Sequence, residues 1–152
     1  SVNEDETVTK TGAQDDLLND DTDADDSSSL SVTNISHSNG NTGTVASSST
    51  YASNGTQIVG TYGTLTVGAD GSYTYTADQD AADSIANGSS ETDVFTYTLS
   101  DGSATDTATI TITVSGADNE VAAVNDTGAV DDNSTLIVGN QSAGILSNDT
   151  DN

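Results

Sequence analysis

The feature that most constrains the fold is a strict alternation of apolar and polar residues after the dipeptide Asp101–Gly102. In TDTATITITV, at 105–114, small or branched apolar residues alternate with threonine. A period of two places successive side chains on opposite faces of a strand, and Asp-Gly favours a tight turn between two strands. The preceding segment DVFTYTLS, at 93–100, alternates in the same way, and its inward-facing residues are expected to be Phe95, Tyr97 and Leu99. The two segments predict a β-hairpin with one buried face.

Other parts of the chain repeat this pattern. TYGTLTV and SYTYTA, at 61–67 and 72–77, flank a glycine-containing turn and predict a second hairpin. Shorter strand-like segments occur at 7–9, 30–36 and 56–60. Residues 78–88 have a spacing that allows one or two helical turns, and residues 36–55 are expected to form a long polar excursion or a flexible hairpin. Many short strands separated by turns predict an all-β sandwich.

The charge of the chain excludes several classes of function. Its 152 residues carry a formal charge of −24, and Lys10 is the only lysine or arginine. Nucleic acids and anionic membrane surfaces are bound through Lys and Arg, so neither is an expected partner. No apolar run approaches the roughly 20 residues that span a bilayer, so no membrane insertion is expected. The absence of cysteine excludes disulfides and thiolate metal sites, and the acidic, threonine-rich composition favours an extracellular protein.

The segment LLNDDTDADD, at 17–26, concentrates five aspartates in seven positions. Two carboxylates about 5 Å apart repel by roughly 0.8 kcal/mol in water and about 3 kcal/mol at an effective dielectric near 20. The alternate spacing of Asp21, Asp23 and Asp25 allows their side chains to converge on one ion, with Asp20 and Asp26 on either side. Calcium binds about six to eight oxygens, so we predict a calcium site here. The alternative is a solvated acidic loop that binds no ion.

The amino-terminal segment recurs near the carboxyl end of the chain. Aligning residues 2–24 with 130–152 matches an Asp-Thr-Asp at 21–23 with another at 149–151. We therefore predict one module over residues 1–120, followed by residues 121–152 as a connector and the start of a second repeat, or as a segment donated to another subunit. The remaining candidate metal ligands lie in the connector and in the second copy of the motif: Asp118, Asn119, Glu120, Asp126, Asp149 and Asp151.

No catalytic constellation stands out. His37 is the only imidazole, and it lies in the loop-like segment SHSNGN, which lacks the nucleophile elbow of a serine hydrolase. The chain is therefore predicted not to be an enzyme. An ordinary exposed side chain is the expectation for Lys10, and turn formation accounts for Asp70 and Asp101, each of which precedes a glycine.

Four segments occur in a characteristic order: LLNDDTDADDSSSLSVTNIS, YGTLTVGADGSYTYTAD, DVFTYTLSDG and TATITITVSGADN. Together they resemble the VCBS or bacterial cadherin-like repeat of giant secreted, RTX-type adhesins. The resemblance implies an immunoglobulin- or cadherin-like Greek-key β-sandwich, tandem repetition, export to the cell surface, and calcium at acidic loops and connectors. It also implies neighbouring repeats or identical subunits as partners, with surface glycans or other cells as further candidates.

We therefore predict a structural repeat module of an exported cell-surface adhesin or fibre, stiffened by calcium. The first alternative is a subunit of an extracellular filament, joined by strand donation from residues 121–152 to the next copy. The second alternative is a carbohydrate-binding module. Its aromatic platform would have to come from five tyrosines, most of which are expected in or near the core.

Overall fold

A computed structural model of the chain describes residues 1–12, 16–23, 29–117, 121–122, 127–130, 132–136 and 150–151. The chain divides into two compact units, residues 1–117 and residues 118–152. Within the described ranges, no helix is long and apolar enough to cross a membrane.

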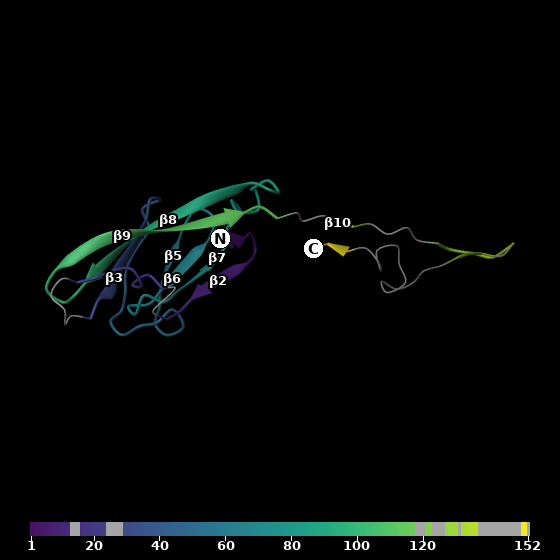
Figure 1. The fold of residues 1–152 in the computed structure, drawn as a ribbon. Coiled ribbons are helices and arrows are strands. Elements are labelled where there is room, and N and C mark those ends of the chain that lie inside the picture. Colours follow the sequence, from purple (N-terminus) through teal and green to yellow (C-terminus); the bar gives the residue numbers. More distant parts are fainter. Residues whose placement is uncertain are drawn as a thin grey trace. The chain divides into compact units, whose positions relative to one another are not determined.

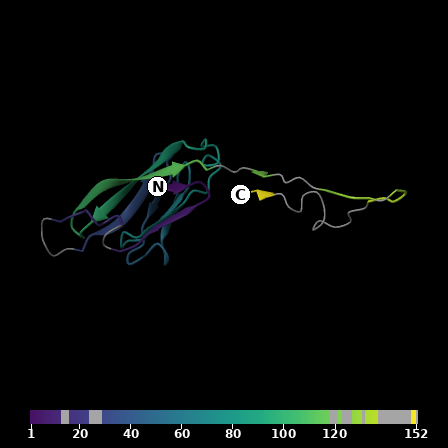
Figure 2. The same ribbon diagram turned by 45° about the vertical axis from the view of Figure 1, so that its right-hand side comes forward.

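The first unit consists of two β-sheets packed face to face (Figures 1 and 2). Strand order is β1-β9-β8-β3-β4 in one sheet and β2-β7-β6-β5 in the other, which confirms the predicted all-β sandwich. The strands are β1 (Val2–Asn3), β2 (Thr7–Lys10), β3 (Ser31–His37), β4 (Thr42–Thr44), β5 (Thr56–Val59), β6 (Thr64–Val67), β7 (Tyr73–Thr76), β8 (Ser90–Ser100) and β9 (Thr105–Ser115).

Both predicted hairpins are present. Strands β8 and β9 pair antiparallel along their whole length without a register shift, and β6 pairs with β7 in the same sense. The turns contain Gly102 and Gly71 with φ of 93° and 82°, a region that glycine enters without steric cost. Asp101 Oδ1 accepts the backbone N–H groups of Ser103 and Ala104, both at 2.6 Å. Turn formation therefore accounts for this aspartate, as predicted.

The structure corrects the prediction for residues 78–88 and decides between the two alternatives for part of residues 36–55. Residues 78–88 form successive tight turns instead of helical turns, because Ala82 N–H donates to Gln79 O and Ile85 N–H donates to Ala82 O, each three residues back. The buried side chains of Ala82 and Ile85 hold these turns against the core. Within residues 36–55, strand β4 pairs with the end of β3, so this part of the excursion is a hairpin.

The core lies between the two sheets and follows the predicted alternation. Phe95, Tyr97 and Leu99 are at most 8% exposed, whereas the threonines of β9 up to Thr111 are exposed. Burying side chains of this size contributes about 1.5–3 kcal/mol each. The largest fully buried apolar residues are Tyr75, Phe95, Ile35, Leu65, Val32, Val67 and Val114.

In the second unit, β10 (Val121–Ala122) pairs antiparallel with β11 (Thr150–Asp151). The assignment of residues 121–152 to a second repeat, or to a segment donated to another subunit, stays a prediction.

Candidate functional site

The acidic loop that begins at residue 17 is fixed to the sandwich by its two leucines. Leu17 is 6% exposed, and its backbone N–H donates to Gly71 O at 3.0 Å. The side chain of Leu18 packs over Gly71, where an added Cβ would lie 2.7 Å from Leu18 Cγ. Apolar contacts therefore hold the chain in place directly before the aspartates.

A core tyrosine positions the first aspartate of the Asp-Thr-Asp motif. The Tyr97 hydroxyl lies 3.1 Å from Asp21 Oδ2 and 3.1 Å from Leu17 O, and it donates its proton to these acceptors. Burial, together with the charge and hydrogen bond of Asp21, raises the pKa of Tyr97 from 10.0 to about 12. Tyr97 is thus a neutral hydrogen-bond donor at physiological pH, and it orients the carboxylate of Asp21 from the core side of the loop.

Asp21 and Asp23 line a pocket of about 190 Å³ at the β8–β9 turn. The hairpin contributes two more aspartates to this pocket, Asp101 and Asp106. Backbone hydrogen bonds from Ala104 and Ser103 lower the pKa of Asp101, which keeps this carboxylate ionised at neutral pH. The remaining lining residues are Thr22, Leu30, Leu99, Ser100, Ala104 and Thr105. The fold thus joins two carboxylates of the loop with two of the hairpin; we call this the acidic pocket.

Neither Asp101 nor Asp106 is among the ligands predicted from the sequence, which assigned Asp101 to its turn alone. The register of the hairpin would have indicated that Asp106 lies near Asp101, because Asp106 pairs with Leu99 and is therefore close to the same turn. What the sequence could not provide was the packing of residues 17–23 against that turn.

The other predicted ligands are not brought together by the described structure. Asp20 is described but does not line the acidic pocket. Only the backbone of Asp151 is described, in β11. The rest lie outside the described residues: Asp25, Asp26, Asp118, Asn119, Glu120, Asp126 and Asp149. Among the side chains that the structure places, no three His, Cys, Asp or Glu residues are arranged to hold a metal ion. The acidic pocket has the donor chemistry that calcium prefers, but its described carboxylates do not complete a coordination shell.

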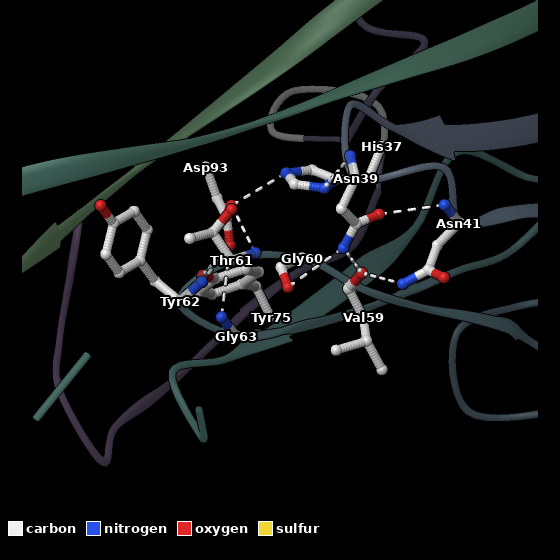
Figure 3. A network of polar contacts seen from close by, with 10 residues as sticks. All are labelled: His37, Asn39, Asn41, Val59, Gly60, Thr61, Tyr62, Gly63, Tyr75 and Asp93. Carbon is white, nitrogen blue, oxygen red and sulfur yellow. Dashed lines mark hydrogen bonds and ion pairs between the residues drawn. The ribbon is translucent and has the colours of Figure 1, made fainter. Parts of the chain in front are cut away.

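A second polar site lies between the sheets, around the fully buried carboxylate of Asp93 on β8 (Figure 3). Five groups donate hydrogen bonds to it: Thr61 N at 2.9 Å, Tyr62 N at 3.0 Å, Gly63 N at 3.2 Å, the Tyr75 hydroxyl at 2.7 Å and His37 Nε2 at 3.0 Å. A carboxylate offers about four lone-pair sites, so this one is saturated. We call Asp93 and its five donors the carboxylate network.

The carboxylate network depends on a tight turn between β5 and β6. Gly60 N–H donates to Gly63 O at 2.8 Å, and the turn directs three successive N–H groups at Asp93. An added Cβ at Gly60 would lie 2.4 Å from Asp93 Oδ2, so only glycine permits this approach. Burial alone would raise the pKa of Asp93, but the hydrogen bonds donated to it outweigh burial and hold the pKa below its ordinary value.

The expectation that His37 lies in a loop is wrong. It is the last residue of β3, is 7% exposed, and packs on the Phe95 ring with centroids 4.9 Å apart. Asn39 N–H donates to its Nδ1 at 3.2 Å, so we assign the proton to Nε2, which donates to Asp93. Both ring nitrogens are therefore engaged, and neither is available to activate a nucleophile. The strand extends to residue 37 because β3 continues to pair with β8 as far as Phe95.

The carboxylate network ties the two sheets together. Asp93 and His37 belong to one sheet, whereas Tyr75 and the 60–63 turn belong to the other. The alternation of β8 contained the signal for this site, because Asp93 shares its face with the core residues Phe95 and Tyr97. An aspartate on an apolar face must be buried and therefore needs donors around it.

The tyrosines are mostly part of the core, as expected. Tyr75 and Tyr97 are buried, and Tyr62 and Tyr73 pack against the core. A carbohydrate platform needs aromatic rings that face solvent, so this arrangement weakens the carbohydrate-binding alternative.

The two-sheet sandwich and its loop-borne acidic pocket define a structural module of the immunoglobulin-like class. Residues 1–116 match the family model of the bacterial cadherin-like domain, so the chain belongs to this family. No curated protein matches the chain. The family match confirms the resemblance seen in the sequence and the cadherin-like architecture of the fold. Domains of this family are structural repeat modules of adhesin-like proteins.

Proposed function

We propose that the chain is a stiff structural repeat of an exported cell-surface adhesin or fibre, in which calcium bound at the acidic pocket holds a loop and a hairpin together. The family supports the module, and the acidic pocket supports the role of calcium. The single observation that carries the proposal is that Asp21 and Asp23, predicted ligands from one loop, lie with Asp101 and Asp106 from a distant hairpin.

The physical benefit of calcium follows from the charge of this pocket. Four carboxylates line the pocket, those of Asp21, Asp23, Asp101 and Asp106, and like charges on one pocket repel. A divalent cation changes this repulsion into attraction between the loop and the hairpin. Asp21 and Asp23 of the loop, with Asp101 and Asp106 of the hairpin, would supply part of the oxygen donors of the ion, which would neutralise their charge and link the two segments. Because Tyr97 already orients Asp21, little ordering is needed at that residue when the ion binds.

Thermal unfolding with and without calcium tests the proposal. Extracellular calcium modules have dissociation constants of about 10⁻⁴–10⁻³ M. Calcium at ten times its dissociation constant would stabilise the fold by about 1.4 kcal/mol, which raises Tm by roughly 5 °C for a unit of this size. Magnesium at equal concentration controls for screening by a divalent ion.

Matched variants locate the effect. Asp106→Asn removes a pocket carboxylate and is expected to abolish most of the rise in Tm, whereas Asp83→Asn removes an exposed aspartate outside the pocket and should preserve it. Superimposed unfolding curves in calcium and in chelator would refute the proposal, as would an equal response of the two variants.

A second candidate function is the filament subunit joined by strand donation. It is favoured by the division of the chain at residue 117, since residues 118–152 lie beyond the family match and form a separate unit. Removing residues 121–152 distinguishes the two functions. Loss of polymerisation by a folded remainder supports the filament, and unchanged behaviour supports a repeat in a tandem array.

A further inference from the structure

His37 is the only side chain of this protein whose type ordinarily changes its charge between pH 5 and 8. The sequence contains one histidine and no cysteine. Aspartate and glutamate ordinarily titrate below this range, and tyrosine and lysine titrate above it. A response of a side chain to pH near neutrality therefore belongs to one residue, and the structure shows what that residue contacts.

The two ring nitrogens of His37 respond differently to an added proton. Nε2 already carries a proton and donates to Asp93 Oδ1 at 3.0 Å, whereas Nδ1 accepts the backbone N–H of Asn39 at 3.2 Å. The added proton must therefore go to Nδ1. It converts the contact with Asp93 into an ion pair, which is stronger than a neutral hydrogen bond. The contact with Asn39 is lost, because two N–H donors then face each other.

The other ionisable groups around His37 keep this asymmetry. Asp93 on β8 is the carboxylate that faces the ring. Tyr75 on β7 meets the same carboxylate as a neutral donor, because burial and the hydrogen bond to Asp93 raise its pKa. Tyr62 reaches Asp93 through its backbone N–H. Strands β4 and β5 and residues 38–41 contain no ionisable side chain, so no charge on them offsets a proton at Nδ1.

Asn39 belongs to a turn that fastens the β3–β4 hairpin to the opposite sheet (Figure 3). Its side-chain amide donates to Val59 O at 3.0 Å, and the amide of Asn41 donates to the same oxygen at 2.7 Å. The backbone N–H of Asn41 donates to Asn39 Oδ1 at 3.0 Å, which couples the two asparagines. Val59 is the last residue of β5, so these amides link the two sheets. We call residues 38–41 the asparagine clasp.

We propose that the asparagine clasp is pH-sensitive and that protonation of His37 releases it from Val59. With a proton on Nδ1, the N–H of Asn39 must turn away from the ring, and its side chain moves with the backbone. The hydrogen bond between Asn39 and Asn41 transmits this movement to the second amide. Both amides then exchange Val59 O for water, and the turn lifts from the end of β5.

The asparagine clasp can open without unfolding the module. Residues 38–41 are exposed and polar or glycine, so opening removes no apolar side chain from the core. Asp93 keeps the imidazolium and its four other donors, and Thr56 Oγ1 still joins β5 to Thr44 O. Asp93 and Leu99 lie about 20 Å apart along β8, so the clasp is remote from the acidic pocket. This inference goes beyond the proposed function and does not depend on calcium.

Nuclear magnetic resonance of the full chain in chelator, from about pH 8 to about pH 5, tests the proposal. The nitrogen shifts of the imidazole report protonation of His37, and the side-chain amide protons of Asn39 and Asn41 report the clasp. Both amides are expected to move to the positions of free asparagine with the midpoint of His37. The backbone N–H of Asn39 should exchange with solvent about tenfold faster than its intrinsic rate predicts from high pH, the factor that loss of one hydrogen bond gives.

Two results of this titration overturn the proposal. One is a protonated His37 beside amide protons of Asn39 and Asn41 that do not move. The other is an imidazole that takes up no proton before the module unfolds.

Variants test the coupling between the proton and the asparagine clasp. Because the two are linked, weakening the clasp must make protonation easier. Asn41→Ala removes the 2.7 Å donor and should raise the midpoint of His37 by roughly half a pH unit, part of the worth of one hydrogen bond. Asn87→Ala, at an exposed residue outside the clasp, is the matched control and should not.

His37→Gln retains a donor for Asp93 but takes up no proton, so its clasp amides should stay constant over the whole range. Equal midpoints in Asn41→Ala and Asn87→Ala overturn the proposal, as does a pH response of the asparagine clasp that persists in His37→Gln.

Discussion

Replacing Asp93 with asparagine keeps the shape of the side chain and changes the chemistry of one buried atom. The carboxylate accepts two hydrogen bonds at Oδ1, from His37 and Thr61, and three at Oδ2. An asparagine has one acceptor oxygen, and its amide N–H₂ must face one of these two groups of donors.

The cost can be worked out from those contacts. If the amide replaces Oδ1, two N–H donors lose their acceptor. If it replaces Oδ2, the Tyr75 hydroxyl can rotate to accept, but the N–H groups of Tyr62 and Gly63 cannot. Each buried donor left without an acceptor costs about 1–3 kcal/mol, so either orientation costs about 4 kcal/mol. That is a large share of the 5–15 kcal/mol typical of a folded domain, and it corresponds to a fall in Tm of roughly 15 °C.

Urea unfolding followed by circular dichroism measures this difference. Asp83→Asn is the control, because it makes the same chemical change and the same change in net charge at an exposed position. If Asp93→Asn were less than 1 kcal/mol less stable than Asp83→Asn, the carboxylate network would not hold the sheets together as argued.

Three further predictions concern pH and packing. The pKa of Asp93 in the folded protein is held below the ordinary value of 3.8. The carboxylate therefore contributes stability above pH 3.8, and this contribution is lost as pH falls through the lower, folded-state pKa. The difference in unfolding free energy between wild type and Asp93→Asn should narrow in acid. The pKa of Tyr97 is raised to about 12, so its contribution is present below pH 10 and is lost as pH rises toward 12. Calcium bound at Asp21 should lower the pKa of Tyr97. The absorbance of tyrosinate, measured against Tyr97→Phe as reference, gives the midpoint of this titration. A midpoint that does not change with calcium would show that no ion binds at Asp21. Leu17→Ala should lower the free energy of unfolding in urea by about 2–5 kcal/mol and weaken any stabilisation by calcium. Leu136→Ala is the control, because this residue is 54% exposed, and it should leave both quantities unchanged. A small and equal effect of the two variants would contradict the docking of the acidic loop.

The alternation of residues 93–114 was sufficient to predict the main hairpin and its buried face, because side-chain direction in a strand depends only on the parity of the residue. The register was decided by the structure: Ser100 pairs with Thr105 across a four-residue loop, whereas a two-residue Asp-Gly turn would pair Ser100 with Ser103. The same local chemistry correctly assigned the turn aspartates. The prediction of helical turns for residues 78–88 was wrong. The spacing of Ala82 and Ile85 fits a helix, but these residues are buried in two successive tight turns.

The sites required contacts between distant segments. Nothing local indicates that Tyr97 would meet Asp21, or that the acidic loop would lie beside Asp106, because these residues are far apart in the chain and meet only when the sheets pack. The burial of His37 was hidden for the same reason, since its acceptor Asp93 is 56 residues away. By itself, the sequence determined the strands, the acidic motif and the family, because these depend on residue order alone. Tertiary structure decided which carboxylates gather at a pocket and which one is enclosed by donors, because both depend on how one sheet covers the other.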